Sequence, residues 1–253
     1  MNFFKKILGS KEESVQPQPV AANDPLERYK AIPWMTQERL ENVSICLNAG
    51  FIPATSLPTE NDIELRSKEE IARRLHALKA IIIWCWATPE DVPDEVILNF
   101  IERNNLGDFL SDQEHEMLQT DRADEDMRRN LGWRFENCWP LAWYFGYQAP
   151  EITGAMMTGE QMSIILQHHT CDLDENITDW LLGVTCVNEQ EVKAKEDLFY
   201  CIHNAVRSAQ LGRPTVPEGF HPMMNGGVIH ERRHSLSWML SKGISWDDIE
   251  LST

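Results

Sequence analysis

Residues 67–86 read SKEEIARRLHALKAIIIWCW, and this stretch combines a helix start signal with a helical repeat of apolar residues. Ser67 and Glu70 form a capping box, because the hydroxyl and the carboxylate can each accept a hydrogen bond from a free N–H group of the first turn. Apolar residues then recur every three or four positions, which predicts an amphipathic helix packed against a core. The residues of this apolar face are Ile71, Leu75, Leu78, Ile82 and Trp86.

The same signals recur along the rest of the chain. Ser111 and Glu114 form a second capping box, and a helix that begins at Thr36 is expected to end at Gly50. No strand-like alternation of useful length interrupts the helical pattern. We therefore predict an all-α fold, built as a single compact multi-helix domain with a flexible N-terminal extension. Further helices are predicted over residues 124–147, 158–169, 173–183, 189–211 and 228–241.

The predicted helix over residues 124–147 is apolar on nearly all of its sides. Leu131, Phe135 and Trp139 lie on one side, while Trp143 lies on another. A helix with this pattern is expected to be buried at the centre of the domain. Proline has no N–H group and its ring clashes with the preceding turn, so Pro140 should kink this helix or split it.

Residues 1–30 are predicted to form a flexible tail and linker, and residues 31–253 the helical domain. Residues 9–25 are polar and carry three prolines, a composition typical of a linker. The first eight residues are too few to form a stable helix in water, although their apolar side chains would share one helical face. They are therefore either a frayed tail or a weak contact with a membrane surface. The apolar residues concerned are Phe3, Phe4, Ile7 and Leu8.

The composition limits the classes of partner. The chain has 253 residues, with 40 acidic and 23 basic residues and a net charge of −17. This charge repels phosphate backbones, so nucleic acid is not an expected partner, whereas a basic partner is compatible with it. The six cysteines include no C-x-x-C pair, which fits buried free thiols in a reducing, cytoplasmic compartment. No segment reaches the roughly 18 consecutive apolar residues of a membrane span.

Several short motifs are spread over about residues 36–253. They are Leu65-Arg66-Ser67 with Glu70 and Arg73-Arg74, Trp133-Arg134-Phe135-Glu136 with Trp139, Ala205 with Arg207, Pro217-Glu218-Gly219, the run from Val228 to Trp238, and Trp246-Asp247-Asp248. Together they resemble the bacterial family catalogued as domain of unknown function 4272, and the run from Val228 to Trp238 is the most specific of them. The family often closes with Asp-Thr, where this chain has Ser252-Thr253. The resemblance implies one domain and implies no activity.

The segment His230-Glu231-Arg232-Arg233-His234 matches the H-E-x-x-H motif of zinc peptidases. On a helix, the two histidines would lie on one face and could share a zinc ion whose water the glutamate activates. A third protein ligand is needed, however, and only 19 residues follow His234. The two arginines add positive charge beside the site, which opposes binding of a cation. We therefore expect no metal or cofactor, and zinc-dependent hydrolysis is the alternative.

Seven arginines form a second set of candidate functional residues: Arg66, Arg73, Arg74, Arg134, Arg207, Arg232 and Arg233. They could pair internally with Glu70, Glu136 and Glu231, or they could bind an anion through paired hydrogen bonds. We expect at least one of Arg232 and Arg233 to be buried against an acid, either Glu70 or Glu136. If a ligand pocket exists, its expected residues are Arg66, Trp133, Arg134, Glu136, Glu231, Arg232 and Arg233.

These observations favour a non-catalytic cytoplasmic binding or protein-interaction protein, for example one that neutralises a basic partner. The expected partner is a protein of unknown identity or a small anionic ligand. The alternative is the zinc-dependent hydrolase built on His230, Glu231 and His234.

Overall fold

The computed structural model describes residues 24–59, 63–122 and 132–252, and it confirms the all-α prediction for these residues. Among them, extended backbone pairs only in a single bridge between Glu64 and Ser241. The helices are α1 (Glu27–Lys30), α2 (Gln37–Asn48), α3 (Lys68–Trp86), α4 (Asp94–Arg103), the 3-10 helix η1 (Gly107–Phe109), α5 (Asp112–Met117), α7 (Gly132–Tyr144), α8 (Gly159–His168), α9 (Ile177–Trp180), α10 (Glu189–Gln210) and α11 (Met224–Met239).

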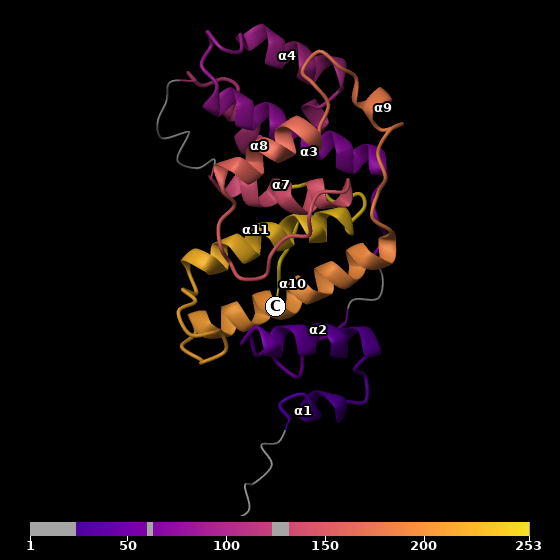
Figure 1. Cartoon of the computed structure of the whole chain (residues 1–253), viewed down its shortest axis with the longest axis vertical. Coiled ribbons are helices and arrows are strands. Elements are labelled where there is room, and N and C mark those ends of the chain that lie inside the picture. Colours follow the sequence, from indigo (N-terminus) through magenta and orange to yellow (C-terminus); the bar gives the residue numbers. More distant parts are fainter. Residues whose placement is uncertain (1–23, 60–62, 123–131, 253) are drawn as a thin grey trace, which may run out of the picture.

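The helices are stacked in layers along the long axis of the molecule (Figure 1). Helices α3 and α4 lie toward one end, while α10, α2 and α1 lie toward the other. Between them, α11 packs against α7 on one side and against α10 on the other. Helix α11 is therefore the central element, and its side chains reach both halves of the stack.

Both predicted capping boxes are present. The Ser67 hydroxyl accepts a hydrogen bond from the backbone of Glu70, whose carboxylate accepts one from the backbone of Ser67. Ser111 and Glu114 are related in the same way at the start of α5. Helix α3 buries Ile71, Leu75, Leu78 and Ile82, as its apolar repeat predicts. The prediction is wrong for Trp86 at the end of the helix, which is 55% exposed, and the polar Arg74, His76 and Lys79 are buried as well.

Helix α7 is central and buried, as the sequence predicts, but Pro140 does not split it. The helix runs from Gly132 to Tyr144 with Pro140 inside, and Trp139 and Leu141 on either side of the proline are buried. The first part of the predicted helix, up to residue 131, lies outside the described residues.

The prediction of a helix over residues 173–183 is wrong for most of that range, since only Ile177–Trp180 is helical. The Glu175 carboxylate accepts from Asp172 N–H and holds a turn at this point of the chain. The Asn176 side chain accepts from Thr178 N–H as the N-cap of α9, so the helix begins only at Ile177.

At the N-terminal end, packing begins inside the range predicted to be a flexible tail. Tyr29 in α1 is fully buried, and its hydroxyl donates a hydrogen bond to the carbonyl of Pro53 at 2.6 Å. The proposed membrane-surface contact of Phe3, Phe4, Ile7 and Leu8 lies outside the described residues. No helix in the described part of the chain is both long enough and apolar enough to cross a membrane.

Candidate functional site

The arginines of α11 point in different directions. Successive residues of a helix are about 100° apart, so Glu231, Arg232 and Arg233 leave α11 on three sides. Arg232 reaches α7 and the segment that follows it, because it contacts Glu136 and the carbonyls of Glu151 and Ala155. Arg233 instead reaches α10. The segment 230–234 therefore connects the layers of the molecule and does not form one face.

Arg232 forms a fully buried ion pair with Glu136. Its Nη2 lies 2.7 Å from Glu136 Oε2, and its guanidinium stacks 4.4 Å from the ring centre of Trp139. The other carboxylate oxygen accepts the N–H of Met157 at 2.7 Å. Burial raises the pKa of Glu136 and lowers the pKa of Arg232, and the pairing opposes both shifts. The predicted pairing of Arg232 with Glu136 is confirmed.

Arg233 forms a second buried pair on the α10 side. Its Nε lies 3.1 Å from Glu196 Oε1, an oxygen that also accepts from the Ser237 hydroxyl. Its Nη1 donates to His203 Nδ1 at 3.0 Å, and its guanidinium stacks 4.3 Å from the ring centre of Tyr200. Arg233 is therefore held by an acid, an imidazole and an aromatic ring at once.

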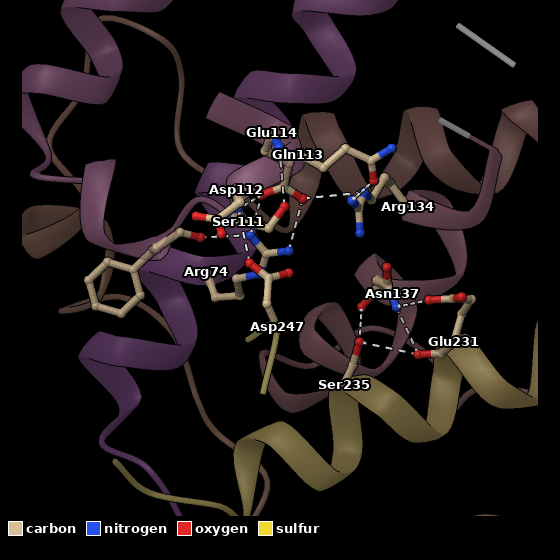
Figure 2. A network of polar contacts seen from close by, with 11 residues as sticks. Arg74, Ser111, Asp112, Gln113, Glu114, Arg134, Asn137, Glu231, Ser235 and Asp247 are labelled. Atoms are coloured by element: carbon tan, nitrogen blue, oxygen red, sulfur yellow. Dashed lines mark hydrogen bonds and ion pairs between the residues drawn. The ribbon is translucent and has the colours of Figure 1, made fainter. Parts of the chain in front are cut away.

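A third network joins α3, α5 and α7 around Glu114, as Figure 2 shows. Arg74 binds both carboxylate oxygens of Glu114, at 2.6 and 2.9 Å, and both residues are fully buried. Arg134 approaches the same carboxylate to 3.3 Å and donates to Gln113 at 2.8 Å. Burial alone would raise the pKa of Glu114, but the two guanidinium groups hold that pKa below its usual range.

The three parts of the H-E-x-x-H motif lie in different surroundings. The His234 ring packs on Trp246, 4.5 Å between ring centres, and its buried Nδ1 has no hydrogen-bond partner among the described residues. The His230 ring instead faces His203 on α10, at 5.3 Å. The Glu231 carboxylate accepts from Asn137 Nδ2 at 3.0 Å, as Figure 2 shows. In the described parts of the chain, no three His, Cys, Asp or Glu residues gather in a way that could hold a metal ion.

The other residues predicted to bind a ligand are also engaged internally. Arg66 donates to the carbonyls of Trp238 and Ser241, both at 2.8 Å, and pairs with Glu70 at 3.1 Å. It therefore fastens the end of α11 to the start of α3. Trp133, 37% exposed, packs so closely on Gly227 that a Cβ atom there would lie 2.7 Å from its ring. The ligand-binding role assigned to the set stays a prediction.

Several residues of these networks carry no signal in the sequence. Asp197, for example, binds Arg39 across 158 residues of chain, at 2.8 Å from its Nε. Glu196 and Asn137 lie in ordinary helical segments and are recognisable only once the helices are packed. Glu114 could be recognised as a capping residue, a role that gives no reason to expect burial.

Two hollows open on the surface beside α10. One, of about 220 Å³, lies between α2 and α10, and its charged lining includes Arg39 and Asp197, which are paired with each other. The other, of about 460 Å³, is lined by His203, Arg207, His230, Leu251 and Ser252.

Charge is distributed unevenly between the interior and the surface. Among the described residues, seven lysines and arginines are buried but only three acidic residues are. The surface is therefore more acidic than the composition alone would suggest. The buried cations are Arg39, Arg66, Arg74, Lys79, Arg122, Arg232 and Arg233, and the buried acids are Glu114, Glu136 and Glu196.

Four exposed carboxylates lie close together in sequence between α8 and the end of α9, and we call residues 171–179 the acidic loop. Its backbone is fastened to α4, because Arg103 donates to the carbonyl of Leu173 at 3.0 Å and Asn104 donates to that of Glu175 at 3.3 Å. The carboxylates belong to Asp172, Asp174, Glu175 and Asp179.

Side chains of α3 also bind the start of the acidic loop. The buried ammonium of Lys79 donates to the carbonyl of Cys171 at 2.5 Å and to the Thr170 hydroxyl at 3.0 Å. The buried imidazole of His76 accepts the N–H of Cys171 at 3.0 Å. The backbone of the acidic loop is therefore fixed on two sides, by α3 and by α4.

Comparison with known proteins identifies the family of the chain. The profile of the domain of unknown function DUF4272 matches residues 34–249. No curated protein and no solved structure matches the chain. Since the match covers most of its length, the chain belongs to the DUF4272 family, as its sequence motifs predict.

Proposed function

We propose that this chain is a non-catalytic binding protein of the bacterial cytoplasm that docks a basic protein partner through the acidic loop. The observation that carries the proposal is the fixed loop itself. The loop carries four exposed carboxylates, and its backbone is bound to α3 by Lys79 and to the end of α4 by Arg103 and Asn104. A loop that is already ordered loses little conformational entropy when a partner binds.

Two further features support the proposal. The net charge of −17 gives the molecule a long-range field that attracts cationic partners and speeds their association, and the burial of seven cations leaves the surface itself more acidic still. Leu182 lies three residues beyond the loop and is 83% exposed, so it could supply an apolar contact beside the charges. The cytoplasmic location is supported by the cysteines of the described residues, which are all free thiols.

Neutralising the acidic loop should abolish capture of the partner. In the test variant, Asp172, Asp174 and Asp179 are replaced by asparagine; Glu175 is kept because its carboxylate holds the turn. Immobilised full-length protein is exposed to a lysate of the native host at about 0.15 M salt, where charges within about 8 Å still interact. We expect the wild type to retain a protein rich in lysine and arginine, and the variant to lose it.

The matched control removes the same number of charges elsewhere, at the exposed Glu160, Glu218 and Glu250, each changed to glutamine. This control should capture the same basic protein as the wild type. Equal retention by the acidic-loop variant, or capture of only acidic proteins by the wild type, would refute the proposal.

A further inference from the structure

The larger hollow beside α10 gathers nitrogen groups from two helices. His203 and Arg207 lie one turn apart on α10, and His230 comes from the facing α11. Leu251 and Ser252 of the C-terminal segment form another wall, and the Ser252 carbonyl accepts from Arg233 Nη1 at 3.4 Å. None of the described residues that line this hollow is acidic. We call it the His203 pocket.

The hydrogen bond from Arg233 sets the tautomer of His203. A guanidinium can only donate, so His203 Nδ1, which lies 3.0 Å from Arg233 Nη1, must be the acceptor. The ring proton of the neutral imidazole is therefore on Nε2, so Nε2–H is the donor of this pocket-lining residue. The side chain is only 3% exposed, so this donor is held in place by the packing around it.

The charged side chain that lines the pocket, Arg207, is a cation, although the molecule as a whole is strongly negative. Burial, together with the nearby charges of Arg233 and Arg207, lowers the pKa of His203 to about 3. Burial also lowers the pKa of His230, where the Glu231 carboxylate acts against the same two arginines. Arg233 is neutralised by Glu196, whereas the exposed Arg207 donates a hydrogen bond to the neutral Gln210 side chain at 2.7 Å and forms no ion pair within the described part of the chain.

We infer that the His203 pocket binds the phosphate group of a small molecule. A phosphate presents several acceptor oxygens in a tetrahedral arrangement, and the pocket offers donors from two helices together with a guanidinium at its opening. Arg207 supplies the charge and His203 a fixed N–H donor. His230 completes the site from the opposite helix. This site is separate from the acidic loop, which suits cations.

The test uses inorganic phosphate and the full-length protein, with the histidine ring signals followed by NMR at constant salt. Saturable shifts of the His203 and His230 signals are expected. The Arg207→Gln variant should bind phosphate at least about tenfold more weakly, since it loses a charge-assisted pair. The matched control is Arg213→Gln, an exposed arginine just beyond the end of α10, and it should bind as the wild type does.

Two results would overturn the inference: histidine signals that phosphate leaves unmoved, or equal weakening of binding in the Arg207 and Arg213 variants. The second result would mean that phosphate responds only to the overall charge. The triple asparagine variant of the acidic loop should bind phosphate at least as well as the wild type, so failure of this inference and failure of the proposed function give different results.

Discussion

Replacing Arg232 with methionine should lower the free energy of unfolding by about 3–5 kcal/mol, because it leaves the buried Glu136 carboxylate without its counter-charge. Arg232 also donates to the carbonyls of Glu151 and Ala155, and these acceptors would be left unsatisfied as well. For a domain of this size, the loss corresponds to a fall in melting temperature of roughly 6–20 °C. Urea unfolding of the purified variant measures the loss of free energy, and thermal unfolding measures the fall in melting temperature.

The control for this prediction is Arg213→Met, which removes an exposed arginine and should leave the melting temperature nearly unchanged. A second variant, Arg232→Met with Glu136→Leu, removes both charges and should recover part of the lost stability. If Arg232→Met unfolds like the wild type, the pair does not stabilise the fold. If the double variant is no more stable than the single one, the loss of the hydrogen bonds from Arg232 to the carbonyls of Glu151 and Ala155 explains the effect better than the uncompensated carboxylate does.

Replacing Glu114 with glutamine should have an effect of similar size at neutral pH, again about 3–5 kcal/mol. The change leaves the fully buried Arg74, together with Arg134, without the carboxylate that both contact. Glu116 lies two residues further along α5 and is exposed, so Glu116→Gln is the matched control and should be nearly silent. Urea unfolding at pH 7 measures the difference between the two variants.

The Glu114 pair also predicts a dependence on pH. The two guanidinium groups hold the pKa of Glu114 below that of an unfolded glutamate, which is about 4.3. The contribution of ionised Glu114 to the free energy of unfolding is therefore fully present above the unfolded pKa. It is lost as the pH falls through the lower pKa of the folded state. The stability gap between wild type and Glu114→Gln should be widest at neutral pH and should narrow below about pH 4.3. A difference in unfolding free energy between the wild type and Glu114→Gln that stays constant down to pH 3 would show that the ionised carboxylate is not the source of the stability.

The helical elements could be predicted well because their signals are local. The capping boxes at Ser67 and Ser111 depend on residues three positions apart, and both are present. The prediction for residues 173–183 is wrong for most of that range because Asn176 caps a helix that begins only at Ile177, a start that apolar periodicity does not reveal. Pro140 is accommodated within a helix that is packed on nearly all sides.

The site residues were predictable only in part, because their partners are distant in sequence. The pairing of Arg232 with Glu136 could be anticipated, since both residues belong to predicted helices whose apolar residues indicate burial. The partner of Arg233 could not, because Glu196 has no feature that separates it from the exposed acids of α10. The His203 pocket combines residues from α10, α11 and the C-terminal segment, and only the packing of α10 on α11 brings them together.

We propose that the acidic loop is the docking surface of this member of the DUF4272 family. Hydrogen–deuterium exchange of the full-length chain, measured alone and then in complex with the captured basic protein, tests it most directly. We expect slower exchange of the backbone amides in residues 171–182 of the complex, because a bound partner limits local opening and access of solvent. Unchanged exchange in these residues, together with protection elsewhere on the molecule, would contradict the claim.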